Sequence, residues 1–343
     1  MTRMSENADE DQISTADTMR KRADESRIKL WLLIGANRQV ITGVLAGTFF
    51  GLFMLGSLLD PTLADMLQDR AVIESLYAQM IGALITGVTL VVTISQLIIS
   101  QENGPLGEQR ARMSETMDFR DYIKELTDKP APADPSAFLR EIIDATQGRA
   151  ETLEERIESA DNRDLKDEVK EFVDSITGNA ETVREELDGA TFGTFDVVHA
   201  SMDYNYSWNI FQIERLVADY EDDIDEEQRA ALEELRTAFS MFGPAREHIK
   251  TLYFQWELIN LSRYILYAAI PALLVSGMMM AFVDATTITG RILGVEALLW
   301  LVAITFTMTL VPFFLLTSYI LRIATAAKRT LAIGPLILRD SQR

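Results

Sequence analysis

The stretch Ser75–Gln101 contains 27 residues without a charge and constrains the fold of this chain more than any other feature. Glu74 and Glu102 flank it on either side. As a helix with a rise of about 1.5 Å per residue, the stretch would reach about 40 Å, enough to cross a bilayer with some tilt. A membrane-spanning helix is therefore the first element that the sequence predicts.

The polar and small residues of this stretch recur at alternating intervals of three and four. This is the spacing of the a and d positions of a heptad, so these residues share one side of a helix. We call this set the polar stripe, and its members are Gln79, Gly82, Thr86, Thr89, Thr93, Gln96 and Ser100. Aliphatic residues cover the other sides of the same helix.

Two interpretations of the polar stripe are open. Small residues and the hydrogen bonds of Ser, Thr and Gln associate helices in membranes, so the stripe could be a packing surface. The stripes of several copies could instead face a common axis and line a water-filled pore, where hydroxyl and amide groups replace part of an ion's hydration shell. The two glutamines cost more in a dry interface, because each amide needs partners for all its donors and acceptors.

Three further apolar stretches are long enough to cross a membrane: Val40–Leu59, Leu258–Val283 and Ala297–Leu321. The first contains Gly43, Gly47 and Gly51 at intervals of four, and such small residues allow a neighbouring helix to approach closely. We therefore predict helix packing at these glycines. Before them, residues 28–38 predict either an amphipathic lead-in at the membrane surface or the first turns of the same helix. The expected fold is an all-α polytopic membrane protein with four transmembrane helices.

Residues 102–257, between the second and third spans, are strongly acidic, with 17 Lys and Arg against 38 Asp and Glu. Apolar residues at helical spacing predict two long helices in 136–188, which would form a coiled-coil-like hairpin. A later helix, from about Glu226 to Phe242, is expected to end at Gly243-Pro244. We expect a large helical domain whose acidic surface excludes nucleic acid as a partner, because binding of phosphates needs basic side chains.

The charged residues also indicate a setting. Arginine outnumbers lysine by 24 to 8, and acidic residues outnumber both together. We interpret this as the solvated surface of a halophilic archaeal protein, with an acidic mesophilic protein as the alternative. The chain has no cysteine, which excludes disulfides, thiolate metal sites and thiol nucleophiles.

The distribution of basic residues predicts the orientation in the cell membrane. Seven Lys and Arg precede the first span and five follow the fourth, whereas each short connection has one. The positive-inside rule therefore places both termini and the insert in the cytoplasm. The expected segments are an N-terminal segment with its lead-in (1–39), helices 1 and 2 (40–101), the acidic domain (102–257), helices 3 and 4 (258–321) and a basic tail (322–343).

The sequence offers little for catalysis. Its two histidines, His199 and His248, lie far apart and have no second histidine at metal-ligand spacing. There is no glycine-rich phosphate loop, no G-x-S-x-G and no H-E-x-x-H. The acidic run Glu221–Glu227 lacks the order of an EF-hand loop and predicts a capped helix junction instead. We expect no enzymatic activity, no cofactor and no metal.

Several charges lie close to the ends of the spans. Glu74 and Glu102 would form the mouths of a pore along the polar stripe and raise the local cation concentration. Glu257 and Arg263, with Glu102, are the charges nearest the inner face. They could form a collar of ion pairs there, but we favour simple solvation at the interface.

Two spans, a large helical insert and two more spans resemble the layout of bestrophin-type anion channels. The resemblance covers topology only, and an acidic insert disfavours anions. We therefore predict a homo-oligomeric channel for inorganic cations, with several copies around the helices 75–101 and gating by the helical domain. The alternatives are a membrane-anchored sensor or scaffold whose acidic domain binds a cytoplasmic protein, and a secondary transporter. The four spans have no charged residue at mid-membrane that could couple ion movement to transport, which argues against the transporter.

Overall fold

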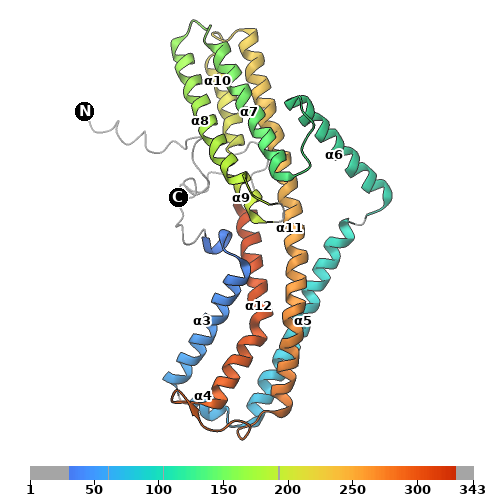
Figure 1. Cartoon of the computed structure of the whole chain (residues 1–343), viewed down its shortest axis with the longest axis vertical. Helices are drawn as coiled ribbons and strands as arrows, with labels where there is room; N and C mark the ends of the chain where they lie inside the picture. Colours follow the sequence, from blue (N-terminus) through green and yellow to red (C-terminus); the bar gives the residue numbers. More distant parts are fainter. Residues whose placement is uncertain (1–30, 61, 103, 192–193, 330–343) are drawn as a thin grey trace, which may run out of the picture. The chain divides into compact units, whose positions relative to one another are not determined.

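The computed structural model describes residues 31–60, 62–102, 104–191 and 194–329 (Figure 1). The elements in order are η1 (Trp31–Gly35), α3 (Arg38–Leu59), α4 (Thr62–Met66), α5 (Arg70–Glu102), α6 (Leu106–Thr127), α7 (Pro135–Ile157), α8 (Arg163–Leu187), α9 (Phe195–Asp203), α10 (Tyr206–Asp219), α11 (Glu226–Phe282), β1 (Arg291–Ile292), β2 (Val295–Glu296) and α12 (Ala297–Arg329). The prediction of an all-helical chain is confirmed apart from the short β1–β2 hairpin. Most of the predicted N-terminal segment and the end of the basic tail lie outside the described residues.

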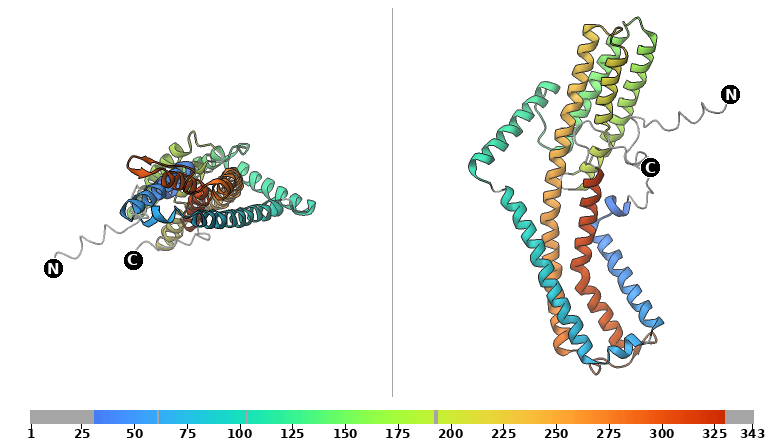
Figure 2. Two further views of the ribbon diagram at one scale, coloured as in Figure 1. Left: turned by 90° about the horizontal axis from the view of Figure 1, so that it is seen from below. Right: turned by 180° about the vertical axis from the view of Figure 1, so that it is seen from behind.

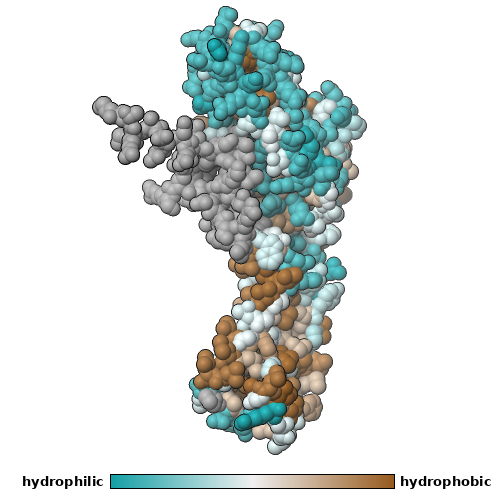
Figure 3. All heavy atoms as spheres, turned by 60° about the vertical axis from the view of Figure 1, so that its left-hand side comes forward, coloured by the Kyte–Doolittle hydropathy of each residue, from teal (hydrophilic) through white to brown (hydrophobic). Residues whose placement is uncertain are grey.

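These elements belong to two compact units, which we describe one at a time. The four-helix unit comprises Trp31–Gly104 and Gln255–Ala326. The inserted unit comprises Pro105–Phe254 and the described residues after Ala326. Figure 3 shows the different surfaces of the two units, which are mainly apolar for the first and mainly polar for the second.

Four helices are long and apolar enough to cross a membrane, as predicted: α3, α5, the second part of α11, and α12. Within the four-helix unit α12 lies between α3 and α11 (Figures 1 and 2). In the most apolar stretch of α12, 44% of the residues are buried, against 17% in α5. Helix α5 therefore leaves most of its surface uncovered by the rest of its own chain.

Apolar packing holds the four-helix unit together at two levels. One cluster joins Tyr77, Met279 and Val302, and a second joins Val91 and Leu315 to α11. Helix α3 makes aromatic contacts with α12. The ring of Phe49 lies 5.6 Å from that of Phe306 and 5.9 Å from that of Phe314, measured between centroids.

Hydrogen bonds between buried hydroxyl groups join three pairs of helices in this unit. They pair Tyr77 with Thr305 (2.6 Å), Thr42 with Ser318 (3.2 Å), and Ser95 with Ser262. Such bonds contribute on the order of 0.6 kcal/mol each inside a membrane. The threonines of α12 follow no single stripe in the sequence, so the partner of Thr305 becomes visible only in the structure.

The inserted unit is built around the packing of α7 against α8. Asp134 caps α7 by accepting a hydrogen bond from the Ala137 amide at 2.9 Å, with Pro135 in the first turn, as predicted. The apolar stripe predicted for the two helices is buried, and consists of Leu153, Ile157, Leu165, Val169, Phe172, Val173, Ile176, Val183 and Leu187. The acidic run ends in a capping box, in which Asp225 and Gln228 exchange side-chain bonds to each other's backbone amides.

The prediction that a helix ends at Gly243-Pro244 is wrong, because α11 continues through both residues. Gly243 lies against a neighbouring ring, since a Cβ there would be 3.0 Å from Cε2 of Tyr206. Proline removes one backbone hydrogen bond from the helix. Burial of Phe242 and Ala245 on either side offsets this loss. The glycine therefore serves close packing rather than a helix stop.

The lead-in also forms a separate element. Trp31–Gly35 make one short turn, and α3 begins only at Arg38. The side chain of Asn37 caps α3 by accepting from the Gln39 amide at 2.8 Å. The lead-in is therefore not the first turns of one continuous helix.

Candidate pore surface and charged clusters

The polar stripe is exposed along its whole length. All seven of its residues are exposed in the chain. Within residues 70–100 of α5, the buried residues are Ile73, Tyr77, Leu84, Val91 and Ser95. Stripe residues lie two positions before and after both Leu84 and Val91, which corresponds to about 200° around a helix. The polar stripe therefore lies opposite the side of α5 that packs against α11 and α12.

The length and hydrogen bonding of the stripe bear on its role. From Gln79 to Ser100 the helix rises about 32 Å, close to the thickness of about 30 Å of a bilayer's hydrocarbon core. Gln79 donates to Ser75 at 3.2 Å, and the hydroxyl of Thr93 donates to the Thr89 carbonyl at 2.8 Å. The hydroxyl of Ser100 likewise donates within α5. Within the described residues the stripe makes no hydrogen bond to another helix.

The glycines of α3 present a second uncovered surface. Gly43, Gly47 and Gly51 are exposed, and a Cβ added at any of them would meet nothing within 4 Å. No helix in the described part of the same chain packs there. The predicted contact at these glycines stays a prediction, because none of the described helices makes it.

The predicted mouths of the pore differ from the expectation at one end. Glu74 forms an ion pair with Arg70 at 2.7 Å, and Arg70 also donates to the carbonyl of Ala281 at 3.3 Å. The negative charge of Glu74 is therefore partly compensated. At the other end, the side chain of Glu102 lies outside the described residues.

A cavity of about 200 Å³ lies between α5, α11 and α12. Its lining is almost entirely apolar and includes Leu84, Val88, Ile265 and Phe313. A permeating ion needs oxygen ligands or water in place of its hydration shell. Thr309 is the one polar side chain among the described residues of the lining, so the cavity offers too few oxygen ligands to replace the polar stripe as a candidate ion path.

Three charged side chains are buried together at one end of the four-helix unit. Arg38, Glu257 and Arg322 are 4%, 8% and 8% exposed. Both arginines donate to the carbonyl of Ala36, and Arg38 also donates to the Ser318 carbonyl at 3.0 Å. We call Arg38, Glu257 and Arg322 the buried charge cluster, and all three act electrostatically on the same neighbour, a tyrosine of α12.

Our preference for simple solvation of Glu257 is wrong, because this carboxylate is buried. Arg263 is exposed, as solvation predicts. Spacing along the chain does not connect Glu257 with Arg38 and Arg322. Their only signal is that each stands at an end of an apolar span, and their three helices meet only in the tertiary structure.

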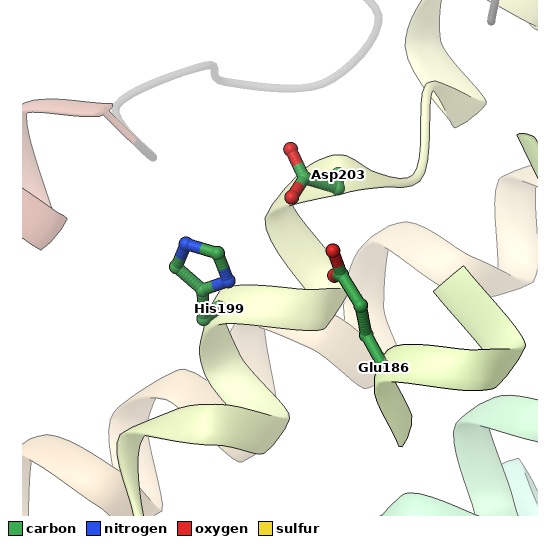
Figure 4. A group of neighbouring side chains, drawn as sticks. All are labelled: Glu186, His199 and Asp203. Atoms are coloured by element: carbon green, nitrogen blue, oxygen red, sulfur yellow. The ribbon is translucent and has the colours of Figure 1, made fainter. Parts of the chain in front are cut away.

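A second cluster lies in the inserted unit, where Glu186, His199 and Asp203 converge (Figure 4). Their ligand atoms all lie within 4.8 Å of one another. His199 and Asp203 lie one turn apart on α9, and Glu186 lies near the end of α8. Although Glu186 is exposed, desolvation by its neighbours, and then the charge of Asp203, raise the pKa of its carboxyl to about 7.

The raised pKa of Glu186 predicts a pH-dependent stability. The folded chain binds this proton more tightly than the unfolded chain, whose carboxyl has a pKa of 4.5. The stability from this group is therefore fully present below pH 4.5 and is lost as the pH rises through about 7. Glutamine cannot ionise, so Glu186→Gln should raise the unfolding temperature at about pH 8. It should leave the unfolding temperature unchanged near pH 4.5.

Thermal unfolding of the purified chain in the presence of a chelator measures this effect. Glu185→Gln is the matched control, because Glu185 is exposed and belongs to the same turn of α8. An equal shift by Glu186→Gln at both pH values would contradict the assignment of the raised pKa.

This cluster of Glu186, His199 and Asp203 was not among the sites predicted from the sequence. The spacing of His199 and Asp203, four residues apart on one helix, was the available signal. Glu186 could not be selected among the many acidic residues, because the contact between α8 and α9 brings it to the other two.

One protein-family model matches the chain over residues 4–343. No curated protein and no solved structure matches the chain. Because the family match covers nearly the whole sequence, the chain belongs to the family described as a family of unknown function, DUF7972.

Proposed function

We propose that this protein is an oligomeric cation channel whose pore is lined by the polar stripes of α5 from several copies. The observation that carries this proposal is the exposure of the whole stripe on the side opposite the packed face of α5. One copy has too few helices to enclose a pore, so the stripes would meet around a symmetry axis.

The chemistry of the stripe argues against contact with lipid. The hydrocarbon core provides no hydrogen-bonding partners, and an unsatisfied amide there costs roughly 2–7 kcal/mol. Gln79 and Gln96 would place two such amides toward lipid. The stripe would therefore face either water or another protein surface. No helix in the described part of the same chain covers it.

Charge supports cations as the permeating ions. The residues 102–257 carry 38 acidic against 17 basic side chains, and in the proposed orientation they lie in the cytoplasm near one end of the pore. A negative surface raises the local concentration of cations, more weakly at high salt. Both units share α11, so movement of the inserted unit would act on the pore through a common helix. A halophilic archaeal cell membrane is part of this proposal.

Cysteine labelling tests whether the stripe is wet, because the chain has no cysteine to remove. Thr89→Cys and Thr93→Cys should react rapidly with a charged, water-soluble thiol reagent in the assembled protein. Ile94→Cys is the matched control, because Ile94 is exposed, lies at nearly the same depth as Thr93, and has no stripe residue three or four positions away, so lipid excludes the reagent there. Equal protection of all three cysteines would refute a water-filled stripe.

The alternative function is a membrane-anchored scaffold whose acidic inserted unit binds a cytoplasmic protein. The exposed glycines of α3 favour at least a contact between copies, which both functions share. The scaffold requires a dry stripe and is compatible with a dimer. Five or more copies in detergent would support the pore, and two copies would support the scaffold.

A further inference from the structure

Neighbouring contacts hold α9, the helix that carries two residues of the cluster in the inserted unit. Asn179, which is buried, donates from Nδ2 to the carbonyl of Asp203 at 2.8 Å and accepts from the Asn205 amide at 3.0 Å. The ring of His199 lies edge-on to that of Phe195, with centroids 5.9 Å apart. The Asn179 bonds therefore fix the backbone at the end of α9, next to Asp203, and the ring of His199 packs against a ring one turn earlier on the same helix.

The donor atoms are close enough for one ion to bind them together. A tetrahedral ion with bonds of about 2.0–2.2 Å holds its ligand atoms roughly 3.4 Å apart. The donors of Glu186, His199 and Asp203 lie within 4.8 Å of one another, so small side-chain rotations are sufficient. Figure 4 shows all three side chains directed toward a common point from two helices.

The ligand types select a class of cation. Carboxylates alone suit Mg²⁺ and Ca²⁺, whereas an imidazole nitrogen favours transition metals such as Zn²⁺. An ion with two positive charges would also balance the repulsion between the neighbouring carboxylates of Glu186 and Asp203. Three protein ligands leave at least one coordination position for water or another group.

We propose that Glu186, His199 and Asp203 form a binding site for a divalent transition-metal cation, with Zn²⁺ as its representative, which clamps the end of α8 to α9. This inference is independent of the proposed channel, because it concerns the inserted unit alone. The sequence predicted no metal, because neither histidine has a second histidine at ligand spacing. The proposal revises that expectation, since Glu186 and Asp203 supply the other ligands.

Titration calorimetry of the full chain with Zn²⁺ tests the proposal. The protein is purified without a histidine tag and stripped with a chelator, so that His199 and His248 are its only imidazoles. We expect one Zn²⁺ per chain, and binding of Ca²⁺ and Mg²⁺ that is weaker by roughly tenfold or more. Glu186→Gln and His199→Gln should each weaken Zn²⁺ binding by roughly tenfold or more.

Two matched variants serve as controls. Glu185→Gln removes a neighbouring exposed carboxylate, and His248→Gln removes the other histidine, which is also exposed. Both should bind Zn²⁺ as the wild type does. Electron paramagnetic resonance of bound Mn²⁺ gives a second readout. Its coupling to a histidine nitrogen should disappear in His199→Gln and persist in His248→Gln.

Gel filtration of each variant shows whether it keeps its fold. Since Glu186 is exposed and His199 only half-buried, both substitutions should be tolerated. A wild-type chain that binds no Zn²⁺, or a folded His199→Gln that binds Zn²⁺ like the wild type, would overturn the proposal.

Discussion

Replacing Thr93 by leucine should abolish cation flux through the reconstituted protein. In a symmetric assembly, one substitution places a leucine from every copy around the axis at the same depth. A hydrophobic constriction of this kind closes a pore by excluding water from it. The measurement is current across a planar bilayer, or cation flux into vesicles, under conditions in which the wild-type protein conducts.

Thr317→Leu is the matched control for this experiment. The hydroxyl of Thr317 donates to the Phe313 carbonyl at 2.9 Å, just as that of Thr93 donates to the Thr89 carbonyl at 2.8 Å. The two substitutions therefore remove the same kind of bond, but Thr317 lies on α12 and outside the polar stripe. Loss of flux in both variants, or in neither, would count against a pore along the stripe.

Glu257→Gln should destabilise the four-helix unit by roughly 3–5 kcal/mol, which is the usual effect of removing one partner from a group of buried charges. Glu257 is the acidic member of the buried charge cluster, and its loss leaves the guanidinium groups of Arg38 and Arg322 together without its charge. The two arginines share the Ala36 carbonyl as an acceptor, so they lie too close for their repulsion to be screened by water. The loss of stability should appear as a lower temperature of thermal aggregation for the variant than for the wild-type protein in detergent.

Arg263→Gln is the control on the same helix, because Arg263 is exposed and its change should have little effect. The double variant Glu257→Gln/Arg322→Met removes one positive charge as well and should recover part of the lost stability. A single variant Glu257→Gln with the stability of the wild type would show that this carboxylate does not balance the arginines.

Properties that depend on neighbours along the chain were predictable. The four apolar helices follow from local length and composition, because bilayer thickness sets how many apolar residues a span needs. The cap at Asp134 and the buried stripe of α7 and α8 follow from helix geometry, which relates residues three and four apart. For the same reason, the shared side of the seven stripe residues was readable without any coordinates.

The sequence by itself thus determined the helices, their periodic faces and the acidic character of the insert. Only the tertiary structure decided which side of α5 is packed, why α11 continues through Gly243-Pro244, and which charges meet in the two clusters. These outcomes depend on contacts between residues far apart in the chain, such as Gly243 with Tyr206 or Glu186 with His199. Such contacts leave no periodic trace in the sequence, because each is fixed by the shape of a partner helix rather than by spacing along its own.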